Sequence, residues 1–78
     1  MEVDLRGMDA VEAICTLSLY LDNAMRSGMK NVRIIHGKGT GVLRDELQKL
    51  IRTIPGVAGV RDEHIQFGGT GVTIVTFD

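Results

Sequence analysis

The sequence contains few cysteine, histidine and aromatic residues, on which disulfide-rich, zinc-binding and base-stacking domains depend. Its single cysteine, Cys15, cannot form a disulfide within the chain. One cysteine and two histidines are also too few for a zinc site with three or four protein ligands. With no tryptophan, one tyrosine and two phenylalanines, a row of aromatic side chains that stacks nucleic-acid bases is poorly supported. We expect Cys15 to pack within a helix.

Long apolar runs and a surplus of charge are absent as well. No segment approaches the roughly 18 apolar residues of a membrane span, and no charged and then apolar leader opens the chain. Nine Lys and Arg against ten Asp and Glu give a net charge of −1, so overall charge would not attract nucleic acid or an anionic membrane. We therefore expect a cytoplasmic protein without a membrane partner, in which any polyanion is bound by a local basic patch.

What the sequence does contain is the pattern of one small α/β domain. Its 78 residues are 44% hydrophobic and 24% charged, as in ordinary globular domains. Alternation over 1–6 predicts a strand, and Asp9, three residues before Glu12, starts a helix of about 17 residues that ends near Gly28. The remaining elements are expected as a strand over 31–36, a helix from about 42 to 55, and strands over 57–63 and 72–77.

The order β-α-β-α-β-β predicts a two-layer arrangement. Parallel β-α-β crossovers are nearly always right-handed, so two crossovers in the same direction place both helices on one face of the sheet. Asp4 and Arg6, out of phase with Val3 and Leu5, should then point to the face without helices. Because the chain begins and ends close to a strand, we expect residues 1–78 to form a single domain that is part of a larger protein.

The stretch His36–Gly41, which reads His-Gly-Lys-Gly-Thr-Gly, is the strongest candidate for a binding loop. Glycines at 37, 39 and 41 let the backbone approach a ligand, and successive N–H groups leading into a helix favour an anion. His36, Lys38, Thr40 and Arg44 add polar and cationic side chains. A P-loop and a dinucleotide fingerprint both fail at this spacing. The phosphate backbone of a polymer is thus favoured over a free nucleotide, and a simple connecting turn is the alternative.

Asp4 and Arg6 form a second cluster, at the end of the first strand. That end should lie at the same sheet edge as the His36–Gly41 loop, because the first two strands are parallel. Arg6 could bind a phosphate or stabilise charge that develops on it. Asp4 could orient Arg6, act as a general base on water or a 2′-hydroxyl, or hold a divalent ion. The structural alternative is a surface ion pair of little energetic value.

These clusters together resemble the Smr (small MutS-related) domain family. The matching segments are Val3-Asp4-Leu5-Arg6-Gly7, the His36–Gly41 loop, and Gly68-Gly69-Thr70-Gly71-Val72-Thr73, which together span almost the whole chain. The pattern is most similar to the C-terminal module of the second bacterial MutS paralogue, a large ATPase. The resemblance implies an α+β two-layer sandwich like the C-terminal domain of translation initiation factor three. It also implies a mixed four-stranded sheet whose last strand is antiparallel and lies between the second and third.

The resemblance further implies endonuclease activity on DNA or RNA with little sequence preference. It also implies a parent ATPase that suppresses homologous recombination and acts on collided ribosomes. By the same resemblance, Asp4 and Arg6 would be catalytic or contact substrate, and the His36–Gly41 loop would bind the backbone. Our first hypothesis is a weak endonuclease in which Asp4 or His36 moves the proton. The second is a DNA- or RNA-binding module without catalysis, and a protein-interaction module is the least favoured.

A two-metal centre is not expected from these residues. Such centres need several carboxylates that converge, and this edge offers Asp4 with Asp62 or Glu63 at best. The sequence therefore requires no cofactor, although a single Mg²⁺ or Mn²⁺ is compatible with it. His64 lies beside these acidic residues and is more simply interpreted as part of a solvated strand end.

Overall fold

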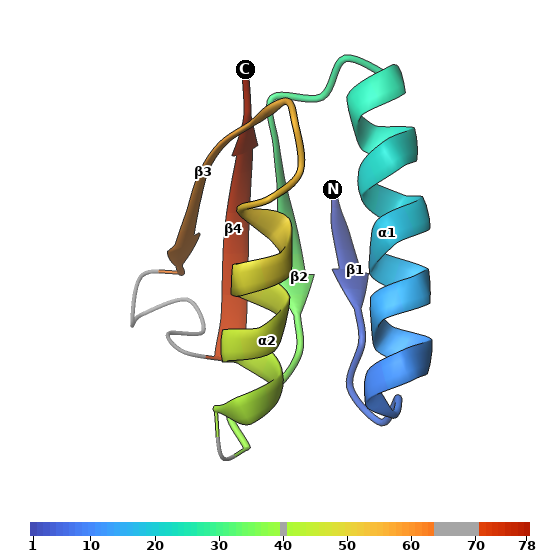
Figure 1. Ribbon diagram of the computed structural model, residues 1–78, viewed down its shortest axis with the longest axis vertical. Helices are drawn as coiled ribbons and strands as arrows, with labels where there is room; N and C mark the ends of the chain where they lie inside the picture. Colours follow the sequence, from blue (N-terminus) through green and yellow to red (C-terminus); the bar gives the residue numbers. More distant parts are fainter. Residues whose placement is uncertain (40, 64–70) are drawn as a thin grey trace.

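The computed structural model describes residues 1–39, 41–63 and 71–78 of the chain. The element order is the predicted one (Figure 1). The elements are β1 (Glu2–Asp4), α1 (Ala10–Arg26), β2 (Asn31–Ile35), α2 (Val42–Ile51), β3 (Val57–Asp62) and β4 (Val72–Phe77).

The four strands form one mixed sheet in the order β1-β2-β4-β3. β1 pairs with β2 in parallel, whereas β4 is antiparallel to both β2 and β3. The register aligns Val3 with Ile34, Ile34 with Thr73, and Thr73 with Asp62, so these four side chains share one face of the sheet. The insertion of the last strand between the second and the third agrees with what the family resemblance implied.

Both helices pack on this same face, as the crossover rule predicted. The fully buried cluster takes strand residues of a single phase together with apolar residues from both helices. In Figure 1, α2 lies over β2 and β4, and α1 lies beside β1. The cluster consists of Leu5, Ala13, Leu17, Leu21, Ala24, Val32, Ile34, Leu47, Ile51 and Val75. The structure is therefore the expected α+β sandwich of one helical layer and one sheet.

Local sequence signals account for the start of α1 but not for every boundary. The Asp9 carboxylate accepts a hydrogen bond from the Glu12 amide at 2.9 Å, which is the predicted N-cap. β1 ends at Asp4, two residues earlier than predicted. α2 ends at Ile51, before Pro55, and the Thr53 hydroxyl donates to the Leu50 carbonyl at 2.6 Å as the chain leaves the helix.

The prediction that Cys15 packs within the helix is wrong, because its side chain is exposed. The core face of α1 carries Ala13 and Leu17, and a residue midway between two such positions points to the opposite side of the helix. None of the helices in the described residues is long and apolar enough to cross a membrane.

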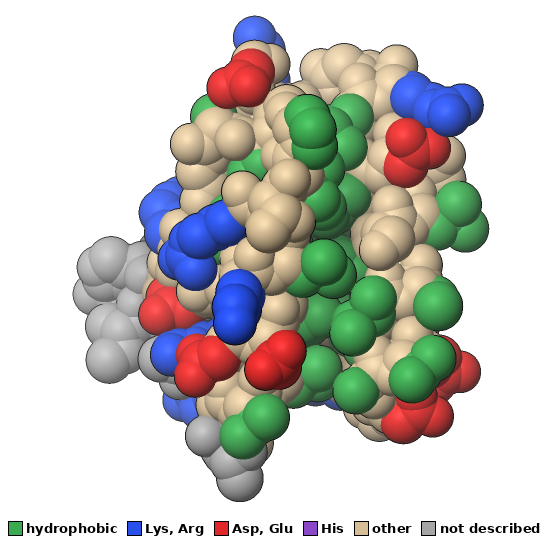
Figure 2. All heavy atoms as spheres, viewed as in Figure 1, with side chains coloured by type: hydrophobic (Ala, Val, Ile, Leu, Met, Phe, Trp, Pro, Cys, Tyr) green, Lys and Arg blue, Asp and Glu red, His purple; other side chains and the backbone are tan. Residues whose placement is uncertain are grey.

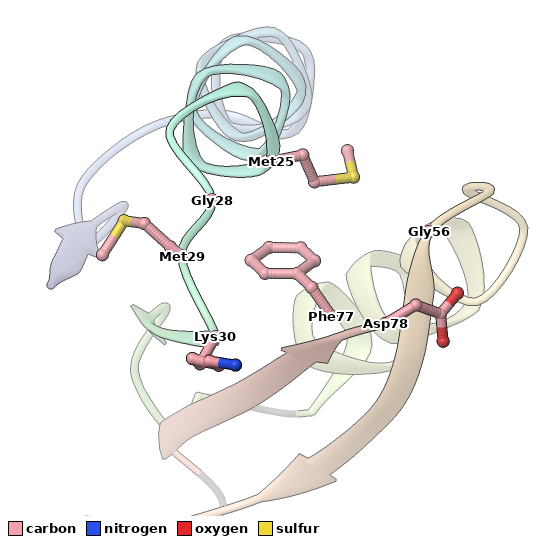
Figure 3. A pocket seen from close by; sticks show the side chains of 7 residues that line it. All are labelled: Met25, Gly28, Met29, Lys30, Gly56, Phe77 and Asp78. Atoms are coloured by element: carbon pink, nitrogen blue, oxygen red, sulfur yellow. The ribbon is translucent and has the colours of Figure 1, made fainter.

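Two of the hollows formed by the described residues have no lining residue from the His36–Gly41 loop. One, of about 280 Å³, is at the opposite sheet edge, where Met25, Met29, Lys30 and Phe77 surround it (Figure 3). The other, of about 560 Å³, lies between the helices, where apolar side chains gather on the surface (Figure 2). Met8, Ala10, Ile14, Val42, Leu43 and Glu46 line this second hollow.

Candidate functional site

The two sequence clusters meet at the carboxyl edge of β1 and β2. The Leu5 amide donates to the Ile35 carbonyl at 2.7 Å, which extends the parallel pairing beyond β1 and holds both chain exits side by side. At the next positions, a Cβ atom built on Gly37 would lie 3.6 Å from Cγ of Arg6. The aliphatic part of Arg6 therefore lies against the first glycine of the His36–Gly41 loop.

Asp4 and Arg6 form a bidentate ion pair on the surface. Nη2 of Arg6 donates to Oδ2 of Asp4 at 2.7 Å, and Nε donates to Oδ1 at 3.0 Å. Their side chains are 46% and 63% exposed, whereas the intervening Leu5 is fully buried, so the predicted outward direction is confirmed. Hydrogen bonds from the Arg6 side chain and amide lower the pKa of Asp4 from 3.8 to about 2.

Gly71 anchors the loop from the neighbouring strand. Its carbonyl oxygen accepts two hydrogen bonds, from the His36 amide at 3.2 Å and from the Gly37 amide at 3.0 Å. A Cβ on Gly71 would lie 3.2 Å from Cγ of Lys38, so a side chain there would press on the loop. The loop is thus fastened to the start of β4. The other members of that motif, Gly68, Gly69 and Thr70, lie outside the described residues, as do His64 and Phe67.

The anion site expected from the loop amides is smaller than the sequence suggested. The amides of His36 and Gly37 are taken by Gly71, and the Gly41 amide donates to the Lys38 carbonyl at 3.2 Å. The Lys38 and Gly39 amides have no acceptor within the described part of the chain and stay available to a ligand. Glycines 37, 39 and 41 all have positive φ, as the interpretation of the loop required. Thr40, named as a further contact, is outside the described residues.

His36 is placed differently from an exposed proton carrier. Its side chain is 6% exposed and lies on the helix side of the sheet. Nε2 is 2.8 Å from the Thr73 hydroxyl, and Nδ1 is 2.9 Å from the Gly37 carbonyl oxygen. Both ring nitrogens are therefore occupied by protein groups in this structure.

Arg44 is paired with two carboxylates that lie outside the loop. Nη2 donates to Asp45 at 2.8 Å, and Nη1 reaches Asp62 of β3 at 3.4 Å. These carboxylates raise the pKa of Arg44, and the hydrogen bond that Arg44 donates to Asp45 is the main cause. Lys38, in contrast, is exposed, and no carboxylate pairs with it among the described residues. Lys38 is the cation of the loop that can accept an anion without breaking an ion pair.

On the open face of the sheet, Arg33 pairs with two carboxylates. Arg33 donates through Nη1 to Glu2 and through Nε to Glu63, both at 2.6 Å. The hydrogen bond from Arg33 lowers the pKa of Glu63. No three His, Cys, Asp or Glu side chains converge in residues 1–39, 41–63 and 71–78, so these residues do not fit a multi-carboxylate metal centre.

Sequence reasoning did not find the polar residues beneath α2. Gln48 donates through Nε2 to the Thr73 hydroxyl at 3.0 Å and to Oδ1 of Asp62 at 2.9 Å. A signal was present, because Gln48 lies on the apolar side of α2 beside Leu47 and Ile51, and Thr73 is in phase with buried Val75. A polar residue on a buried face usually has a specific hydrogen-bond partner.

Comparison with known proteins decides the family. The model of the Smr domain matches residues 3–78 of the chain. The chain belongs to the Smr domain family. It is 47% identical to Endonuclease MutS2 of Clostridium tetani over 74 residues, which is 95% of this chain and 9% of that protein. It is 52% identical to Endonuclease MutS2 of Clostridium botulinum over 73 residues, again 9% of that protein's length.

Solved Smr structures agree with the fold. The crystal structure of the Smr domain of Thermus thermophilus MutS2 is 38% identical and covers 99% of this chain and 96% of its own, with a TM-score of 0.94. YdaL, a stand-alone small MutS-related protein from Escherichia coli, has a TM-score of 0.90 over 97% of this chain and 63% of its own. At 22% identity, YdaL supports the fold of this Smr domain and nothing further.

Proposed function

We propose that this Smr domain binds the phosphate backbone of DNA or RNA and cleaves it as an endonuclease with little sequence preference. The observation that carries the proposal is that the Asp4–Arg6 ion pair and the His36–Gly41 loop are in contact at the carboxyl ends of β1 and β2. The Asp4–Arg6 pair lies against Gly37, beside the Lys38 and Gly39 amides that have no acceptor among the described residues. Such a combination of fixed amides and cations suits a phosphodiester.

Arg6 is the group proposed to hold the scissile phosphate. Its Nε and Nη2 are held by Asp4, whereas Nη1 makes no hydrogen bond within the described residues. Of the three roles open to Asp4, the geometry favours orientation of Arg6. A carboxylate with a pKa of about 2 is a weak base at neutral pH, so we expect slow turnover.

His36 is proposed as a residue that holds the loop. Asp4 or His36 was expected to move the proton, but a ring with both nitrogens hydrogen-bonded to protein must first break one of these contacts. The Lys38 side chain and the amides of Lys38 and Gly39 supply the remaining contacts to the phosphate backbone, and Gly37 and Gly41 shape the loop through their positive φ angles. Arg44 reaches a phosphate only by leaving Asp45 and Asp62.

The direct test is cleavage of supercoiled plasmid and of single-stranded RNA, with Mg²⁺ and with EDTA. We expect Asp4→Asn and Arg6→Ala to lose most of the cleavage. Asp22→Asn and Arg26→Ala are matched controls, because Asp22 and Arg26 form an exposed ion pair of 3.0 Å elsewhere, on α1. Cleavage by the Asp4 and Arg6 variants at the wild-type rate, with folding unchanged, would refute the catalytic assignment.

A second candidate is a binding module without turnover. It is favoured by the pairing of Arg6, Arg33 and Arg44 with carboxylates and by the lack of a metal-type cluster among the described residues. One outcome of the test is that the domain cuts neither nucleic acid and still retards one of them in an electrophoretic mobility assay in a salt-sensitive way. If Lys38→Ala weakens that retardation, the binding module replaces the endonuclease as the proposed function.

We further propose that this domain is part of a larger MutS-like ATPase, since the chain spans 9% of the length of the relatives it matches. Suppression of homologous recombination predicts preference for DNA, and action on collided ribosomes predicts preference for RNA. The plasmid and RNA arms of the cleavage test separate these two settings.

A further inference from the structure

A continuous chain of hydrogen bonds runs beneath α2 from β3 to the binding loop. It starts at the Asp62 carboxylate, passes through Gln48 and the Thr73 hydroxyl, and reaches the ring of His36 and the Gly37 carbonyl. Thr73 is fully buried, and Gln48 is 8% exposed. Solvent therefore has little access to the middle of this chain.

The chemistry of the two ends fixes the direction of every bond between them. An ionised carboxylate only accepts, so Gln48 must present its Nε2 amide to Asp62, and the second hydrogen of that amide points to Thr73. The Thr73 hydroxyl thus accepts from Gln48. Its own hydrogen has a single acceptor among the described residues, Nε2 of His36 at 2.8 Å.

The other end requires the same arrangement. The Gly37 carbonyl only accepts, so Nδ1 of His36 must carry a proton to donate across 2.9 Å. A ring that accepts at Nε2 and donates at Nδ1 is the neutral Nδ1–H tautomer. The Gly37 end requires a proton on Nδ1 and the Thr73 end requires an unprotonated Nε2, so the two ends together specify this tautomer.

We propose that Gln48, Thr73 and Asp62 are positioning residues that hold His36 as the neutral Nδ1–H tautomer and thereby fix the Gly37 carbonyl. With this carbonyl turned toward the ring and the Gly37 amide on Gly71, the peptides on both sides of Gly37 are held. The Lys38 amide belongs to the second of these peptides and is then presented in a fixed direction. The Gly39 amide belongs to the next peptide, whose carbonyl accepts a hydrogen bond from the Gly41 amide. The last step rests on the proposed function, since it makes these amides the phosphate contacts.

The first experiment measures the tautomer directly, by ¹H–¹⁵N correlations of the imidazole ring in the 78-residue protein, with His64→Gln used to assign the two histidines. We expect the Nδ1–H form for His36 in the wild type. Thr73→Val should admit the Nε2–H form and speed hydrogen exchange of the Lys38 and Gly39 amides. Thr73→Ser, which keeps the hydroxyl, should restore both properties.

The second experiment measures binding of a labelled single-stranded oligonucleotide. We expect Thr73→Val to bind about three- to tenfold more weakly, the effect of one hydrogen bond, and Thr73→Ser to bind nearly as the wild type. Gln48→Met provides an independent break in the chain if Thr73→Val does not fold. Lys49→Met, one position along on the exposed side of α2, is its matched control.

The Nε2–H tautomer in the wild type would overturn the proposal. So would a Thr73→Val or Gln48→Met protein that folds and keeps the wild-type tautomer and loop exchange. A third outcome is that the wild type binds no nucleic acid, yet His36 is the Nδ1–H tautomer in the wild type and not in Thr73→Val. In that case the proposed function is refuted, and the role of Asp62, Gln48 and Thr73 in positioning His36 is supported.

Discussion

At the scale of single residues, the Asp4–Arg6 pair couples the charge of the site to pH. Asp4 stays ionised in the folded domain down to a pH of about 2, whereas its ordinary pKa is 3.8. Because the folded pKa is the lower one, the stabilisation from this pair is complete above about pH 4 and is lost as the pH falls toward 2. At neutral pH the site therefore carries an ionised Asp4 that a phosphate must face.

This gives a direct prediction for Arg6→Gln. Removal of the guanidinium removes the main cause of the shift, so the pKa of Asp4 should rise from about 2 toward 3.8. The measurement is a pH titration of the Asp4 side-chain carboxyl by ¹³C NMR. Arg26→Gln, which breaks the Asp22–Arg26 pair instead, should leave the titration of Asp4 unchanged. An unshifted Asp4 in Arg6→Gln would contradict the assigned cause.

At the scale of elements, the shape of the loop depends on backbone angles that glycine supplies. Gly37 has φ of 83°, and Gly28, at the far end of the sheet, has φ of 74°. Alanine at either position should lower the free energy of unfolding by about 1–2 kcal/mol, because a side chain disfavours this left-handed region. Urea unfolding of Gly37→Ala and Gly28→Ala measures this cost.

The two variants should differ in function. Gly37 precedes the proposed phosphate contacts, whereas no heavy atom lies within 4 Å of a Cβ built on Gly28. We expect Gly37→Ala to weaken oligonucleotide binding and Gly28→Ala to bind as the wild type at equal loss of stability. Equal binding by both would show that the loop backbone makes no contact with the ligand.

The elements also show what the sequence could predict and what it could not. Apolar periodicity gave all six elements, and the Asp9 cap and the interior of α1 follow from local rules. The adjacency of Arg6 and Gly37 followed from parallel pairing. The contact of Arg44 with Asp62 did not follow, because Asp62 lies on a strand distant in sequence.

The buried polar chain was missed for a related reason. A periodicity argument assigns Gln48 and Thr73 to a face, but it does not say which polar groups will meet there. His36 was assigned by its place in a glycine-rich loop, whereas its Nε2 is hydrogen-bonded to Thr73, which lies 37 positions further along the sequence. The number of loop amides available to an anion was likewise overestimated, because the His36 and Gly37 amides donate to Gly71.

At the scale of the whole molecule, a net charge of −1 predicts that nucleic acid is attracted locally. With few unpaired cations, affinity should fall with salt on a shallow slope, of about −3 or less steep in log–log form. Lys38→Ala should weaken binding and reduce the slope by about 1. Lys30→Ala makes the same change in net charge at the opposite sheet edge and should have little effect. Fluorescence anisotropy across a salt series measures both.

The position of β4 has a consequence for how the protein is made. It is the last of the four strands to be synthesised, yet it is the only described strand that pairs with β3, and it borders β2 as well. While β4 is still inside the ribosome, the only strand pair of this sheet that can form is that of the short β1 with β2. Gly71 directly precedes β4, and its carbonyl holds the His36–Gly41 loop. The proposed nucleic-acid site is therefore assembled last, when synthesis of the domain is complete.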